Sequence, residues 1–164
     1  MRALLLALLV LLTGCGPECG SVKDGDEIAD GTMCMERLLG TLRVSSGFEP
    51  EEIEAIWLAA GDWADATNGR AQLSVLVVDS GANVSVRDPS AEHDGMSYAH
   101  SGRIELKSKV LSPEKLRLLV AHELGHYLGL GHTVPGEIMH RKAVTPISAA
   151  DVAHFDRLWA ERAP

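Results

Sequence analysis

The most informative stretch of this sequence is HELGHYLGLGH, residues 122–132. Within a helix, His122 and His126 lie about one turn apart on the same face, so both imidazoles can reach one ion. Gly129 can take the left-handed conformation that ends a helix, after which the chain can turn back and present His132. Three histidine nitrogens with one exchangeable position are the ligand set of a catalytic zinc, so the stretch predicts a Zn²⁺ site.

The segments on either side of this stretch show both helical and strand patterns. Apolar spacing and capping residues predict helices over residues 49–67, over residues 112–130 and after Ser148. Short apolar or alternating runs predict strands over residues 36–44, 73–78, 84–86 and 102–109. The run at 73–78 is mostly Val and Leu, which is typical of a buried strand. One domain of mixed helices and strands is therefore expected.

Composition narrows the possible classes of function. The chain has 164 residues, a length typical of one domain. A nucleic-acid-binding surface needs a basic patch, and the formal net charge of −8 argues against one. Aromatic residues make up 4% of the chain, too few for a base-stacking surface. No nucleic-acid partner is expected.

The N-terminus has the pattern of an export signal. Arg2 precedes an apolar run at 3–12, which is too short to cross a bilayer because a spanning helix takes about 20 residues. The run ends in Leu12-Thr13-Gly14-Cys15, which resembles the bacterial lipobox, where the peptide is cut before a cysteine that becomes lipidated. We expect a lipoprotein signal peptide over 1–14 and a lipid anchor at Cys15 in the cell envelope, at the outer membrane rather than the inner one. An ordinary signal peptide, and hence a secreted protein, is the alternative.

Two cysteines are left once Cys15 carries lipid. Export places Cys19 and Cys34 in an oxidising compartment, where a disulfide between them is expected. Free or intermolecular thiols are the alternative. Residues 16–32 are rich in Gly and Asp and lack periodicity, so residues 15–35 are expected to form a lipidated tether.

The stretch 122–132 matches the pattern H-E-x-x-H-x-x-G-x-x-H, and the chain therefore resembles the metzincin zinc metalloproteases. Met139 resembles the family's Met-turn residue, which implies a packing platform beneath the metal rather than a ligand. His132-Thr133 and the segment 63–67, WADAT, are similar to motifs of the matrixin branch. The resemblance implies an α+β, zincin-type catalytic domain over 36–164, with a twisted mixed sheet, an active-site helix and a C-terminal helix.

The activity implied by this resemblance is that of a zinc-dependent metalloendopeptidase. His122, His126 and His132 would hold the zinc, and Glu123 would be the general base toward a zinc-bound water. The substrate would be an extended peptide or protein segment that pairs with a sheet edge around residues 97–101, and the enzyme is expected to be a monomer. A non-enzymatic zinc-binding envelope lipoprotein is the alternative. Glu123 argues against it, because a structural zinc site needs no base.

Some family features are missing from this sequence. Matrixins carry a second, structural zinc on three His and one Asp, but only His100 matches clearly, and Glu105 stands near the place of another ligand. A second zinc or a calcium ion is not expected, although His93 and Asp94 could form a partial site with His100. A surface position or local hydrogen bonds are expected for the histidines outside the motif: His93, His100, His140 and His154.

The segment 17–22 is similar in part to the matrixin cysteine switch, in which a propeptide thiolate blocks the zinc. Glu18 stands where that motif has arginine, and too few residues precede Cys19 for a prodomain. A disulfide is therefore the expected state of Cys19.

Overall fold

The structure is a computed structural model that describes residues 19–24, 27–98, 101–142 and 145–161. The predicted signal peptide, Cys15 and His100 lie outside these described residues. Within them the chain forms four helices: α1 Met35–Leu38, α2 Pro50–Ala66, α3 Pro113–Leu128 and α4 Ala149–Ala160. In the described part of the chain, every helix is too short or too polar to cross a bilayer.

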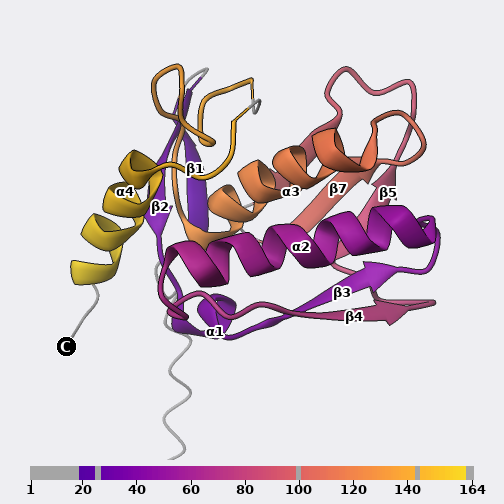
Figure 1. Ribbon diagram of the computed structural model, residues 1–164, viewed down its shortest axis with the longest axis horizontal. Helices are drawn as coiled ribbons and strands as arrows, with labels where there is room; N and C mark the ends of the chain where they lie inside the picture. The colour runs from indigo at the N-terminus through magenta and orange to yellow at the C-terminus, as the bar shows by residue number, and fades with distance from the viewer. Residues whose placement is uncertain (1–18, 25–26, 99–100, 143–144, 162–164) are drawn as a thin grey trace, which may run out of the picture.

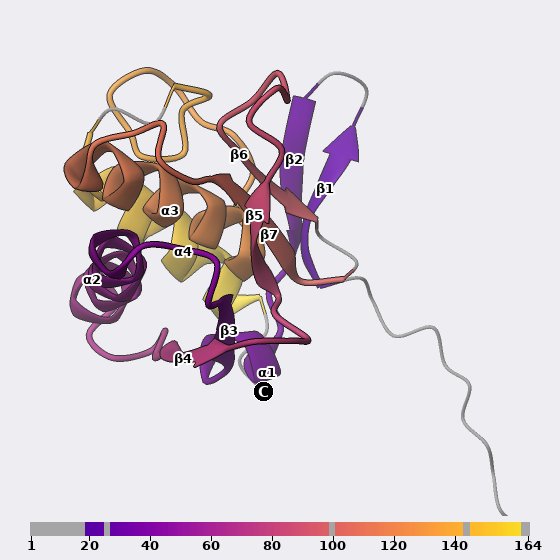
Figure 2. The same cartoon turned by 90° about the vertical axis from the view of Figure 1, so that its right-hand side faces the viewer.

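A five-stranded sheet supports the helices (Figure 1). Its strands are β3 Thr41–Ser45, β4 Ser74–Val78, β5 Val84–Arg87, β6 Gly95–Tyr98 and β7 Arg103–Lys107. They lie in the order β4-β3-β5-β7-β6, and all neighbours are parallel except β6, which runs antiparallel to β7. Helices α2 and α3 pack together on one face of this sheet (Figure 2). The fold is mixed α/β with a mostly parallel sheet, in agreement with the mixed domain expected.

Local sequence signals explain where the two long helices begin and end. Helix α2 starts with Pro50, and Glu49 caps it in a reciprocal capping box with Glu52. Helix α3 starts with Pro113, directly after its N-cap Ser112. It ends at Leu128, and Gly129 is its C-cap. Gly129 has φ 112°, so it takes the left-handed conformation that favours glycine.

The strand predicted at 73–78 forms as β4, but the prediction that it is buried is wrong. Strand β4 lies at the edge of the sheet, with β3 as its neighbour. The side chains of Leu76 and Val77 are 51% and 44% exposed. An apolar run alone cannot distinguish a central strand from an edge strand, because that depends on which other segments pair with it. The segment 36–44 also differs from expectation, since it holds the end of α1 as well as most of β3.

The segment 15–35 was expected to be a tether, but most of its described residues form two strands. Strands β1 Gly20–Asp24 and β2 Glu27–Thr32 form an antiparallel hairpin that packs against the main domain (Figure 2). A disulfide joins Cys19 and Cys34, whose Cα atoms are 5.5 Å apart, so the hairpin's two ends are tied together. Cys19 is thus paired with Cys34, and a thiolate from it is not available to a metal. The hairpin sequence shows little alternation of apolar and polar residues. Its strands are stabilised in part by contacts with segments that are distant in the chain.

Candidate metal centre

The structure brings together the three histidines of the motif. His122 and His126 are buried on the C-terminal half of α3, and His132 follows the turn at Gly129. One ring nitrogen of each histidine lies within 4.8 Å of the corresponding atoms of the other two. Three ring nitrogens at this separation could hold one metal ion between them.

Backbone carbonyls fix the orientation of the two helical imidazoles. The Nδ1 of His122 donates to the carbonyl of Ile138 at 2.7 Å, and the Nδ1 of His126 donates to the carbonyl of Leu130 at 2.7 Å. These bonds set the tautomer, so the Nε2 atoms are the acceptors that a metal requires. The Nε2 of His126 is buried and has no hydrogen-bond partner. A buried polar atom without a partner is costly, and a metal ion at this point would satisfy it.

Burial favours the neutral forms of His122 and His126. It lowers the pKa of His122, and it lowers the pKa of His126 well below the ordinary value, with further lowering by His122 and His132. A metal binds only the neutral imidazole, so protons compete little for these nitrogens at neutral pH.

Glu123 follows His122 on helix α3 and is buried, with 5% of its surface exposed. Burial raises the pKa of its carboxyl group to about 8, against smaller opposite effects of Arg87 and the backbone N–H of Ser97. Strand β6 passes close to this carboxyl group. A Cβ atom at Gly95 would lie 2.9 Å from the Glu123 Oε1, so glycine makes the close approach possible. The carboxyl group of Glu123 thus lies against an edge strand, on the helix that carries His122 and His126.

The contribution of Glu123 to the stability of the metal-free protein is expected to fall as the pH rises from about 5 to about 8. The folded protein keeps the Glu123 proton up to a pKa of about 8, whereas the unfolded chain loses it near the ordinary value of 4.5. At Glu123 the folded state binds more protons between these values, so this group lowers the free energy of unfolding by up to about 1.4 kcal/mol per pH unit, whereas the lowered pKa values of His122 and His126 act in the opposite direction below pH 6.5. Urea unfolding at pH 5.5, 7.0 and 8.5 measures this slope. The variant Glu123→Gln should lose it, and the same slope in both proteins would assign the effect to other groups.

Met139 packs directly beneath the ligand helix. Its side chain is fully buried, and a Cβ atom at Gly125 would overlap its Sδ atom. The same Cβ would lie 3.2 Å from the ring of Trp63. The glycine inside the H-E-x-x-H motif therefore leaves space for the methionine, at a helical position where glycine costs roughly 1 kcal/mol relative to alanine.

Gly125→Ala is expected to destabilise the protein by about 1–3 kcal/mol, despite the better helix propensity of alanine, because overpacking displaces Met139. Thermal and urea unfolding measure the change. Gly61→Ala is a matched control in α2, because a Cβ at Gly61 meets no atom within 4 Å. That control should be neutral or stabilising. A stable Gly125→Ala protein would show that Met139 is free to move.

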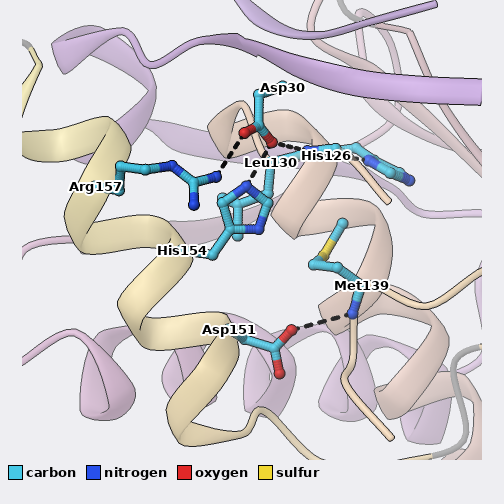
Figure 3. Close-up of polar contacts among 8 residues, drawn as sticks. Asp30, His126, Leu130, Met139, Asp151, His154 and Arg157 are labelled. Carbon is cyan, nitrogen blue, oxygen red and sulfur yellow. Dashed lines mark hydrogen bonds and ion pairs between the residues drawn. The ribbon is translucent and has the colours of Figure 1, made fainter. Parts of the chain in front are cut away.

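Asp151 on α4 is a site residue that is not predicted from the sequence. Its buried carboxylate accepts from the backbone N–H of Met139 at 3.3 Å (Figure 3). It also accepts from the backbone N–H of Ile138 at 3.1 Å, and the two bonds hold the Met139 turn. The same carboxylate also accepts from the Ser148 backbone N–H at 2.8 Å, as part of a capping box, and from the Ser148 hydroxyl at 2.6 Å. The S-x-x-D pattern at 148–151 signals a helix start, but not that the same carboxylate reaches a turn before the helix.

His154 differs from its expected role. The sequence predicts a surface or locally hydrogen-bonded histidine, but His154 is 8% exposed and its Nε2 lies 2.5 Å from the Oδ1 of Asp30, which is 124 positions away. His93 is exposed. The carboxylates considered for a second metal site pair with cations instead: Asp94 with Lys107 at 3.0 Å and Glu105 with Arg87 at 3.1 Å.

No protein-family model matches this chain, and no curated protein matches it with significant similarity. The interpretation of the site therefore depends on its own residues and geometry.

Proposed function

We propose that this protein is a zinc-dependent endopeptidase of the metzincin type, with the matrixin branch as its nearest resemblance. One observation carries the proposal: a buried carboxyl group, that of Glu123, follows His122 directly on the helix that carries two of three converging histidines. A structural metal site has no use for this carboxyl group, and burying it without a metal is costly because burial disfavours its ionised form.

The donor set fits zinc. Zinc favours imidazole nitrogens, and catalytic zinc sites have three protein ligands and an exchangeable position. His122, His126 and His132 would supply the three nitrogens. When bound, zinc would supply Lewis acidity, which polarises a peptide carbonyl and makes a water molecule acidic at neutral pH.

Glu123 is the proton carrier in this proposal. A cation among the three histidines would favour the ionised carboxylate, which burial alone disfavours. The carboxylate would then accept the proton of the attacking water and return it to the leaving amine. Its buried position keeps bulk water away from this transfer, and its contact with the Ser97 backbone fixes it beside β6.

Strand β6 supports binding of an extended peptide. It is the last strand in the sheet order and has β7 as its neighbour, so its other edge can pair with a peptide strand. The predicted segment 97–101 overlaps the end of β6, and Glu123 lies against the start of this strand at Gly95. A substrate backbone paired along β6 would pass the carboxyl group and the histidine cluster.

The proposed location is the bacterial cell envelope, with a lipid anchor at Cys15 and protein substrates in the envelope or outside the cell. The Cys19–Cys34 disulfide supports an exported protein, because such bonds persist in oxidising compartments.

The decisive experiment incubates the purified protein with a diverse peptide library and identifies products by mass spectrometry. Cleavage at internal peptide bonds is expected, with loss of activity after zinc is removed by a chelator and recovery when zinc is added back. A protein that binds zinc but cleaves no peptide would support the alternative, a non-enzymatic zinc-binding lipoprotein.

A further inference from the structure

The third histidine is supported by a different part of the chain from the other two. His122 and His126 are fixed by helix α3, whereas His132 lies after the helix has ended. The segment 129–132 runs along strand β2 of the N-terminal hairpin. The backbone N–H of Gly31 donates to the Gly129 carbonyl at 2.9 Å, and the His132 N–H donates to the Ile28 carbonyl at 2.7 Å.

Asp30 adds a side-chain contact at the centre of this segment. Its Oδ1 accepts from the backbone N–H of Gly131 at 2.9 Å, one residue before the ligand (Figure 3). The same carboxylate lies 2.5 Å from the His154 Nε2 and accepts from the Arg157 guanidinium at 2.8 Å. Asp30 therefore connects the ligand segment to helix α4. Burial opposes ionisation of Asp30, but the contacts with Gly131, His154 and Arg157 outweigh burial and lower its pKa.

The space at Gly131 shows how close the two segments are. A Cβ atom on Gly131 would lie 2.5 Å from the Ala29 carbonyl carbon and 2.6 Å from the Asp30 nitrogen. Both of these are backbone atoms, which cannot move aside as the end of a flexible side chain can. The ligand segment and β2 thus fit together at backbone contact, and a shift of the hairpin would move the segment that carries His132.

We propose that Asp30 is a positioning residue for the third metal ligand, and that the N-terminal hairpin is part of the metal site rather than a spacer. The inference rests on the metal binding in the proposed function, but not on peptide hydrolysis. Asp30 acts through Gly131 and α4, and it does not touch the metal. Loss of its carboxylate would free the ligand segment and weaken zinc binding.

The test compares zinc affinities by competition with a chromophoric chelator. Asp30→Ala should raise the zinc Kd by about 10- to 100-fold, the usual effect of removing a partner that orients a ligand. Asp30→Asn keeps an oxygen acceptor for Gly131 and should raise the Kd less. Asp156→Ala is the matched control on α4, since it removes an ion pair with Arg70 at 2.5 Å without involving the hairpin. It should leave the Kd unchanged, and an unchanged Kd in Asp30→Ala would overturn the proposal.

Hydrogen exchange in the metal-free protein separates positioning from general destabilisation. Asp30→Ala should speed exchange at the amides of Gly131 and His132 while the helix amides of α2 stay protected. If Asp30→Ala does not fold, the same hydrogen-exchange measurement is made on Asp30→Asn. In that variant, amide protection and a zinc Kd both equal to those of the wild type would overturn the proposal. A wild-type protein that binds zinc but cleaves no peptide would contradict the protease and leave this inference standing. A wild-type protein that binds no zinc would overturn both.

Discussion

Replacing Glu123 by glutamine is expected to lower kcat/KM for peptide cleavage by about 10²- to 10⁴-fold, the usual contribution of a general base. Glutamine has nearly the same shape, so the packing against Gly95 and the histidine cluster should be kept. It cannot accept a proton at neutral pH, and the loss should fall on kcat rather than KM. Zinc content, measured by elemental analysis, should equal that of the wild type.

Glu114→Gln is the matched control for this substitution. Glu114 lies on the same helix, in its first turn, and its side chain is exposed. Its replacement should change kcat/KM by less than twofold. Activity in Glu123→Gln equal to that of the wild type would rule out Glu123 as the base.

His126→Ala is expected to abolish specific zinc binding, with a rise in Kd of more than about 100-fold, since partners outside the ligand shell already account for changes of up to that size. His126 is the ligand whose Nε2 is buried without a hydrogen-bond partner, so its environment is the one most directly explained by a metal. Peptide cleavage should be lost in parallel with zinc. Competition with a chelator gives the Kd, and the library assay gives the activity.

Stability must be followed in the same experiment. In the metal-free protein, His126→Ala removes the bond to Leu130 but also an unsatisfied nitrogen, so these two effects on the free energy of unfolding oppose each other. His93→Ala is the control, because His93 is exposed. It should bind zinc like the wild type. Zinc bound with unchanged affinity in His126→Ala would contradict the proposed ligand set.

The part of the site that the sequence predicts is the part that local structure determines. The spacing of His122 and His126 on one helix face, the glycine that ends the helix and the return to His132 are all set within eleven consecutive residues. The limits of α2 and α3 follow from their Pro residues and caps in the same way. The disulfide between Cys19 and Cys34 was also expected, since they are the two cysteines left after Cys15.

The other features of the fold and the site depend on contacts between segments that are distant in the chain. The sequence of neither segment alone predicts such a contact. Asp30 lies in a Gly- and Asp-rich stretch that has no strand pattern of its own, and its strand β2 pairs with β1 and lies along the segment 129–132. Asp151 is recognisable as a capping residue but not as the support of Met139. The exposure of β4 is not predictable from its own sequence for the same reason, because the order of strands in a sheet is a property of the whole fold.

The position of Asp30 also affects when the metal site can form during folding. Asp30 is 101 positions before Gly131 and 124 before His154, whereas the two cysteines that close the hairpin are only 15 apart. Contacts between distant positions carry a larger loop-closure entropy and tend to form late. A growing chain therefore contains all three histidines before it contains α4, to which Asp30 ties the ligand segment. The segment that carries His132 is fully held in place only after β2 and α4 have both packed against it. The proposed metal site is therefore complete only in the completely folded protein.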